Sequence, residues 1–253
     1  MKAVVLSLII FTCIIGGAVI GIFLRVMLPD RHLSDESRNM VTLGMGIVAT
    51  MGALAVGLLI QGAQENFRDQ RSDLVDMSAK IVLLDKLLAD YGPEAEGARD
   101  TLRGSVELTI NRFWPRDGSD GAGLDVLSGR DTVYGKILSL APHSDRESSI
   151  RDEAVSLTYD LAQARYSMVM GQSRSIPGVF MIVIGIIVFW FVAIFFSFGL
   201  YAPTNGTVVL TLIISALSVS LALFLIMELN RPFDGFLRMP SAPLVEALQY
   251  IGK

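Results

Sequence analysis

Long uncharged hydrophobic stretches alternate along the chain with shorter stretches that are rich in charge. Four windows hold no charged side chain: 3–24, 40–60, 176–198 and 206–227. Each is long enough for a helix of about 20 residues, which crosses the roughly 30 Å hydrocarbon core of a bilayer. Buried helices of soluble proteins seldom run this far without a charge, so we predict four transmembrane helices rather than a soluble helical core.

The first window could instead be a cleaved signal sequence. A secretory signal has a shorter apolar core and a cleavage site made of small residues. Here the apolar run continues past Gly16-Gly17 as far as Leu24, and Cys13 lacks the small residues that precede a lipoprotein cysteine. We therefore expect this window to remain in the protein as its first span.

Four spans put both chain ends, and the segment between the second and third windows, on one side of the membrane. Lys and Arg near the span ends are more numerous on that side, and positive charge marks the cytoplasmic face. Arg25, Arg31 and Arg38, on the opposite side, weaken this bias. We expect transmembrane hairpins over 1–62 and 175–229, a cytoplasmic domain over 63–174 and a cytoplasmic tail over 230–253.

The segment between the second and third spans has the periodicity of α-helices. From Phe67 to Tyr91 apolar residues recur at spacings of three, four and seven, and Gly92-Pro93 then breaks the pattern. We therefore expect the second span to continue as one long helix to that point. Further helices are predicted over about 93–114, 124–140 and 150–168. The apolar seams of the first and last helices can pair antiparallel or face another subunit.

The expected fold class is thus an all-α membrane protein, with a cytoplasmic helical domain inserted between transmembrane helices 2 and 3. The 253 residues are 18% charged, with a net charge of −4 and a mean hydropathy of +0.53. This modest negative charge gives no indication of nucleic-acid binding. The expected partners are the lipid bilayer, further copies of the chain and inorganic ions.

Motifs for enzymatic chemistry are missing from the sequence. The two histidines, His32 and His143, are expected on opposite sides of the membrane, so they cannot share a metal site or a catalytic triad. A stretch from Asp117 resembles a calcium loop, but Ser128 stands where the glutamate of such a loop belongs. We therefore expect no enzymatic activity, no cofactor and no metal.

Small residues follow one face of the second span. Ala49, Ala53 and Gly57 repeat every four residues, which lets helices approach closely in lipid. Ordinary helix packing explains this pattern; the functional alternative is that the slim helix surrounds a symmetry axis and lines a pore. No span holds the carboxylates that coupled carriers keep near the midplane, so a passive pore fits better than a pump. The candidate pore-lining residues are Thr50, Leu54, Gly57, Leu58 and Gln61, of which the leucines are candidates for a gate that closes by dewetting.

The other spans differ in character from the second. The third and fourth carry bulky side chains that we expect to face lipid: Phe189, Trp190, Phe191, Phe195, Phe196, Leu223, Phe224 and Leu225. Hydroxyls inside the spans are expected to bond to the preceding turn of their own helix. They are Thr42, Thr50, Thr211, Ser215, Ser218 and Ser220.

The densest group of special residues follows the fourth span. Pro232 ends the helix, and Gly235 permits a turn. Three charges, Glu228, Arg231 and Asp234, could pair with one another or with the cytoplasmic helices. The full candidate motif is Glu228, Asn230, Arg231, Pro232, Phe233, Asp234 and Gly235.

This motif, together with the stretches 84–94 (LDKLLADYGPE) and 202–205 (APTN), resembles a family of bacterial membrane proteins of unknown function called bestrophin-like. The resemblance covers essentially the whole chain. It implies kinship with bestrophins, pentameric anion channels with two spans, a cytoplasmic helical block and two further spans. Bestrophins carry a similar stretch of Glu, Asn or Asp, Pro-Phe and Gly after their fourth span.

The chain also departs from the bestrophin pattern. Asp234 stands nearly alone where calcium-activated bestrophins have a run of acidic residues, so calcium gating does not carry over. The second span also lacks their phenylalanine-rich neck, which leaves anion selectivity open. Our leading hypothesis is a homo-oligomeric passive ion channel of the bacterial inner membrane. The alternative is a non-conducting scaffold or signalling protein whose cytoplasmic helices bind a partner.

Overall fold

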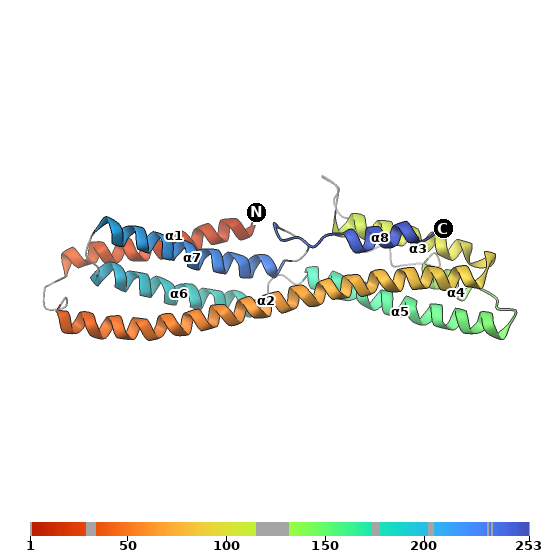
Figure 1. Ribbon diagram of the computed structural model, residues 1–253, viewed down its shortest axis with the longest axis horizontal. Coiled ribbons are helices and arrows are strands. Elements are labelled where there is room, and N and C mark those ends of the chain that lie inside the picture. Colours follow the sequence, from red (N-terminus) through yellow and green to blue (C-terminus); the bar gives the residue numbers. More distant parts are fainter. Residues whose placement is uncertain are drawn as a thin grey trace. The chain divides into compact units, whose positions relative to one another are not determined.

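The computed structural model describes residues 2–28, 34–114, 132–173, 178–201, 205–231, 233 and 235–252, and every regular element among them is helical (Figure 1). The elements are α1 (Lys2–Met27), α2 (Asp35–Tyr91), the 3₁₀ turn η2 (Pro93–Ala95), α3 (Glu96–Phe113), α4 (Val133–Leu138), α5 (Asp145–Ser173), α6 (Gly178–Tyr201), α7 (Gly206–Leu229) and α8 (Ala242–Tyr250). They form two compact units, and α2 contributes to both. Unit 1 comprises Met1–Phe67 and Ser175–Leu237, and unit 2 comprises Arg68–Arg174 and Arg238–Lys253.

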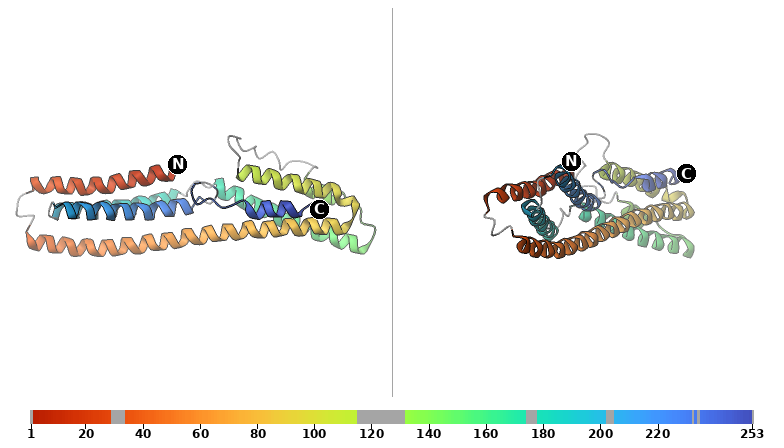
Figure 2. Two further views of the ribbon diagram at one scale, coloured as in Figure 1. Left: turned by 45° about the horizontal axis from the view of Figure 1, so that its top comes forward. Right: turned by 60° about the vertical axis from the view of Figure 1, so that its left-hand side comes forward.

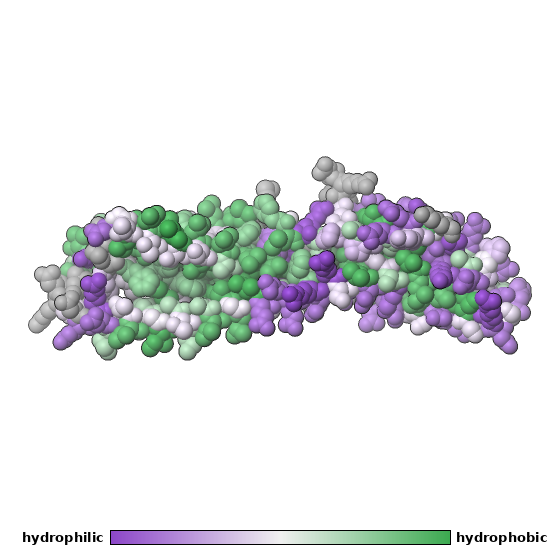
Figure 3. Space-filling model, in the orientation of Figure 1, coloured by the Kyte–Doolittle hydropathy of each residue, from purple (hydrophilic) through white to green (hydrophobic). Residues whose placement is uncertain are grey.

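Four helices are long and apolar enough to cross a membrane: α1, the first part of α2, α6 and α7. They coincide with the four uncharged windows, so the chain is an all-α membrane protein, as predicted. The side chains of unit 1 are mostly hydrophobic on the face shown in Figure 3, whereas those of unit 2 are mostly hydrophilic. This contrast follows from the uneven distribution of charge along the chain.

Unit 1 is organised around α1, which packs along both α6 and α7 (Figure 2). Ile14 of α1 and Ala216 and Leu223 of α7 are fully buried in this bundle. The hydroxyl of Ser220 donates to the carbonyl oxygen of Ser7 at 2.8 Å and thereby joins α7 to α1. We expected Ser220 to bond within its own helix, and this was wrong. The hydroxyl points at the neighbouring helix, where a polar group in an apolar core needs a partner.

Glycines allow the backbones of α1 and α6 to approach closely. A Cβ atom on Gly21 would lie 2.9 Å from the backbone nitrogen of Leu200 and would also meet the carbonyl oxygen of Phe196. A Cβ on Gly17 would meet the side chain of Val192 at 2.9 Å. From the α6 side, a Cβ on Gly199 would meet the backbone of α1. Gly17 and Gly21, four residues apart on α1, therefore form a helix contact inside the chain.

The bulky residues of α6 and α7 do not all face outward. Phe189 is 65% exposed and Trp190 45%, as expected for lipid-facing residues, but Phe191, Phe195 and Leu223 are buried. Their predicted place at the lipid rim was wrong. Phe191, Phe195 and Leu223 belong to the core that α1, α6 and α7 enclose, because a close-packed bundle needs large apolar side chains to fill its interior.

Unit 2 pairs the second part of α2 with α5. The two helices run antiparallel (Figures 1 and 2), and Lys80 Nζ lies 2.7 Å from Asp160 Oδ2 between them. Helix α2 ends at Tyr91, immediately before Gly92-Pro93, as predicted. Its buried stripe is made of Leu74, Met77, Ile81, Leu84 and Leu88. Among the predicted seam of α5, Ala154 and Met168 are buried and the rest are partly covered.

Helix α5 begins with a reciprocal cap. The Ser144 hydroxyl accepts from the backbone N–H of Glu147, and the Glu147 carboxylate accepts from the backbone N–H of His143. The hydrogen bond from the His143 N–H to the carboxylate lowers the pKa of Glu147. Of the predicted helix over 124–140, the structure describes residues 132–140, in which α4 is the helical part.

The close α1–α6 contact makes a prediction about stability. Gly21→Ala places a methyl group against the backbone of α6, and overpacking of this kind costs about 1–3 kcal/mol. Gly16→Ala is the matched control, because a Cβ there meets nothing within 4 Å. The control should change the free energy of unfolding by less than about 1 kcal/mol, in either direction. Unfolding of both variants in mixed micelles measures the difference; equal stability would contradict the packing.

Candidate pore-lining face and the turn after the last span

The predicted pore-lining residues share one uncovered face of α2. Thr50, Leu54, Gly57, Leu58 and Gln61 are all exposed, Leu54 at 61% and Leu58 at 70%. At 100° per residue, four of them lie within an arc of about 60°, and Leu58 lies about 40° beyond it. The opposite face packs on the three-helix bundle through Met45, Val48, Ala49, Ala55, Val56, Leu59 and Ile60.

Helical geometry separates this face into two parallel stripes. One stripe holds small or polar residues at spacings of three and four, and we call it the small-polar stripe: Asn39, Thr42, Gly46, Thr50, Ala53, Gly57, Gln61 and Gln64. The other is bulky and apolar: Met40, Leu43, Ile47, Met51, Leu54 and Leu58. The predicted set mixed the two and missed Asn39, Thr42, Gly46, Ala53 and Gln64. The regular spacing of polar residues along an uncharged helix was the signal that could have identified them.

Nothing within the described chain covers the small-polar stripe. A Cβ added to Gly46 or to Gly57 would meet no atom within 4 Å. By contrast, a Cβ on Gly52, on the bundle side, would meet the Phe191 ring at 3.5 Å. Thr50 satisfies its hydroxyl by donating to the carbonyl oxygen of Gly46 at 2.9 Å, which makes it tolerable in lipid. A single copy of the chain therefore presents the predicted residues without enclosing a path beside them.

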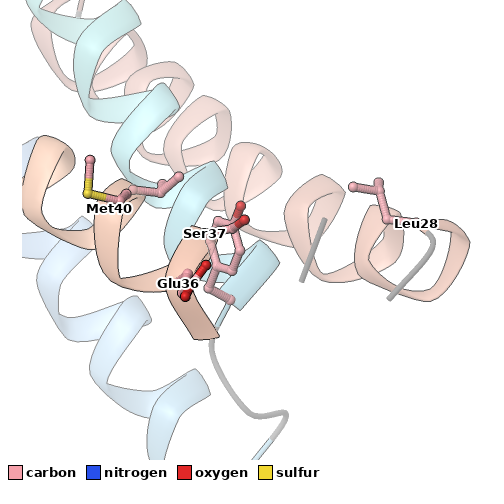
Figure 4. A pocket seen from close by; sticks show the side chains of 6 residues that line it. Leu28, Glu36, Ser37 and Met40 are labelled. Carbon is pink, nitrogen blue, oxygen red and sulfur yellow. The ribbon is translucent and has the colours of Figure 1, made fainter. Parts of the chain in front are cut away.

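Two open pockets of unit 1 lie near the start of α2, where Thr42 is the member of the small-polar stripe that lines one of them. One, of about 550 Å³, is lined by Leu28, Glu36, Ser37, Met40, Val41 and Tyr201 (Figure 4). The second, of about 200 Å³, lies beside it and is lined by Arg38, Val41, Thr42, Met45, Ser197, Phe198 and Tyr201. Neither is lined by any of the five predicted pore residues. Within the described ranges, no group of three or more His, Cys, Asp or Glu side chains is placed to hold a metal ion.

The turn after α7 is organised by the carboxylate of Glu228. This side chain is only 2% exposed, and it accepts hydrogen bonds from the backbone N–H groups of Phe236 and, at 3.4 Å, Leu237. Gly235 has a φ of +100°, and a Cβ there would also meet the Glu228 carboxylate. The chain therefore needs glycine at this point to fold back onto the end of the helix.

The remaining motif residues close the helix or lie outside the described ranges. The Asn230 side chain donates to the carbonyl oxygen of Ile226 at 2.8 Å, which satisfies one of the last carbonyls of α7. Phe233 is buried. We predicted that the charges of Glu228, Arg231 and Asp234 could pair with one another or with the cytoplasmic helices. Pro232 and Asp234 are outside the described residues, and the Glu228 carboxylate binds backbone N–H groups instead of Arg231.

A second buried carboxylate, Asp85 in unit 2, was missed as an organising residue. Asp85 is 6% exposed and forms a two-pronged ion pair with Arg99, with both N–O distances 2.9 Å. The hydrogen bond from this pair raises the pKa of Arg99. Asp85 also accepts from the backbone N–H of Gly252 at 3.3 Å, while Arg103 donates to the carbonyl of Ile251 at 2.9 Å. The sequence signal that could have identified Asp85 was a charged residue beside the apolar stripe of α2.

The Glu228 turn makes a prediction that a double-mutant cycle can check. Glu228→Ala removes the charged acceptor of the part-buried backbone N–H groups of Phe236 and Leu237 and should lower the free energy of unfolding by about 1–3 kcal/mol. Gly235→Ala should be destabilising in the native background but less so beside Glu228→Ala, because the obstructing carboxylate is gone. Gly185→Ala, where a Cβ meets nothing within 4 Å, serves as the control. Strictly additive effects would show that the two residues do not act together.

Comparison with known proteins agrees with this architecture. The family model of the Bestrophin-like domain matches residues 12–244, which is nearly the whole chain and includes the second part of α1, the other three spans, most of unit 2 and the Glu228 turn. No curated protein and no solved structure matches the sequence. On the strength of the family match, the chain is a member of the bestrophin-like family of membrane proteins.

Proposed function

We propose that this protein is a homo-oligomeric, passive ion channel in which α2 lines an axial pore. The observation that carries the proposal is the uncovered small-polar stripe of α2. Exposed apolar residues on a membrane helix need only lipid. This row instead carries Thr42 and Thr50 inside the uncharged window and Asn39, Gln61 and Gln64 at its two ends, and polar side chains are less favourable in hydrocarbon than apolar ones. Water or another protein surface would satisfy these side chains.

A ring of subunits provides the small-polar stripe with both water and a neighbouring protein surface. One four-span chain is too small to enclose a water path, whereas copies of α2 around an axis can do so. Bestrophins are pentamers, and a pentamer is therefore the expected assembly. In this arrangement Thr50, Gly57 and Gln61 face the axis, and Leu54 and Leu58 form a narrow apolar section that can close by dewetting.

Anions are the favoured permeant ions. Arg68 follows Gln64 by one turn on the same helix, so a ring of α2 helices would place a ring of positive charge beyond the polar end of the path. The proposal also includes the membrane orientation, with both termini and residues 63–174 in the cytoplasm of a bacterium. The positive charge bias around the span ends supports this orientation.

Cysteine accessibility tests the lining face. In a background in which the native Cys13 is replaced by serine, cysteines at Thr50, Gly57 and Gln61 should react with a water-soluble, charged thiol reagent. Cysteines at Val48 and Val56, which pack on the bundle, are the matched controls and should remain unreacted. Equal protection at all five positions would contradict a water-filled path along the small-polar stripe.

Electrical recording tests conduction directly. The purified oligomer in planar bilayers should pass a current that changes when the apolar section is made polar, so Leu54→Ser should raise the open fraction at a given voltage. Ile213→Ser, on an exposed face of α7, is a control for general disturbance of the bilayer-facing surface. Absence of single-channel current from an intact oligomer, over a wide range of salts and voltages, would sink the channel proposal.

Exposed aromatic residues of unit 2 favour a second function, a scaffold whose cytoplasmic helices bind a protein partner. Tyr159 and Tyr166 lie two turns apart on α5, 59% and 54% exposed, and Tyr159 forms an edge-to-face pair with Tyr134 at 5.2 Å. Tyrosine is enriched at protein interfaces. This function predicts a defined cytoplasmic partner whose affinity falls in the Tyr159→Ser and Tyr166→Ser variants, together with an oligomer axis closed by side chains or lipid.

A further inference from the structure

Arg165 in unit 2 is a half-buried arginine whose guanidinium lacks an adequate partner. It lies on α5, eight residues before the end of that helix. Among the described residues it forms no ion pair, and its Nη2 atom reaches one acceptor, the carbonyl oxygen of Ser105 on α3, at 3.5 Å. A guanidinium has five N–H donors, so one long hydrogen bond leaves most of them unsatisfied.

The acceptor that Arg165 does reach is already occupied. The hydroxyl of Thr109 donates to the same Ser105 carbonyl oxygen at 2.8 Å. A carbonyl oxygen in a helix also accepts the N–H group of the residue four positions later. The bond from Arg165 is therefore a third and weaker one.

A neighbouring positive charge, that of Arg112, raises the cost of burying Arg165 further. Burial, and secondarily the positive charge of Arg112, lower the pKa of Arg165. Arg112 stands in the last turn of α3, two helical turns after Ser105 and on the same face of the helix. It too forms no ion pair among the described residues. In contrast, Lys80, Arg99, Arg103 and Arg151 of unit 2 all have carboxylate partners.

From this geometry we infer that Arg112 and Arg165 form a binding site for an oxyanion of the phosphate class. A partly buried cation is stable when an anion neutralises it and accepts its hydrogen bonds. Arg165 reaches α3 through its bond to Ser105, and Arg112 of α3 lies close enough for its charge to act on Arg165, so the two guanidinium groups can offer several N–H donors to the oxygens of one phosphate group. A free phosphate and a phospholipid headgroup offer the same chemistry, so the experiment must distinguish these two sources.

Thermal unfolding of the full-length protein, reconstituted in phosphatidylcholine nanodiscs, provides the test. Inorganic phosphate, titrated at constant ionic strength with chloride as the other anion, should raise the unfolding temperature saturably. Arg165→Gln and Arg112→Gln should each raise the phosphate concentration that gives half of the maximal stabilisation by about 10- to 100-fold. This is the change expected when hydrogen bonds between charged groups are lost. Arg151→Gln is the matched control on the same helix, and it should respond as the wild type does.

The phosphate-free baseline adds a readout that is independent of binding. Because Arg165→Gln removes an uncompensated charge, it should unfold at the same temperature as the wild type or higher when no phosphate is present. The site would belong to a lipid headgroup if phosphatidylglycerol nanodiscs stabilise the wild type and free phosphate does not. In that case Arg165→Gln should lose the stabilisation by phosphatidylglycerol. If neither source stabilises the wild type, or if Arg165→Gln responds as strongly as the wild type, the site does not exist.

Discussion

The close approach of α1 to α6 is the contact on which the arrangement of unit 1 depends. Helices in lipid gain little from hiding apolar surface, so they associate where small residues let their backbones and side chains meet closely. Gly17, Gly21 and Gly199 provide such a contact, and Ser7 and Ser220 add a hydrogen bond between α1 and α7. Three spans therefore satisfy one another. The fourth, in α2, packs on them with one face and leaves its small and polar residues uncovered.

Buried carboxylates organise both units by binding backbone groups. Glu228 holds the N–H groups of the turn that follows α7, and Asp85 holds Arg99 and the N–H group of Gly252. A carboxylate offers several acceptor sites, so it can satisfy donors that a single carbonyl could not. This shared use explains why both positions carry acids although neither belongs to a cluster suited to a metal or to catalysis.

Arg165 shows the opposite situation within the same protein. Its charge is partly buried, and among the described residues no carboxylate pairs with it, whereas Arg99, Arg103 and Arg151 each have one. The neighbouring charge, that of Arg112, is of the same sign. Charged groups of this kind persist where something supplies the missing counter-charge. Together, the uncovered stripe of α2 and Arg165 indicate that the part of one copy that the structure describes does not satisfy all of its own polar groups.

The sequence by itself determined the four spans, the long second helix and its end at Tyr91, because these depend on local properties: exclusion of charge over 20 residues, periodicity, and the break at Gly92-Pro93. It also placed Thr50, Gly57 and Gln61 on one helical face. Only the tertiary structure decided which faces are covered. It buried Phe191, Phe195 and Leu223, turned Ser220 toward α1, and gave Glu228 backbone partners in place of Arg231. Such choices depend on which distant segments meet, and hydropathy along one helix carries no information about its neighbours.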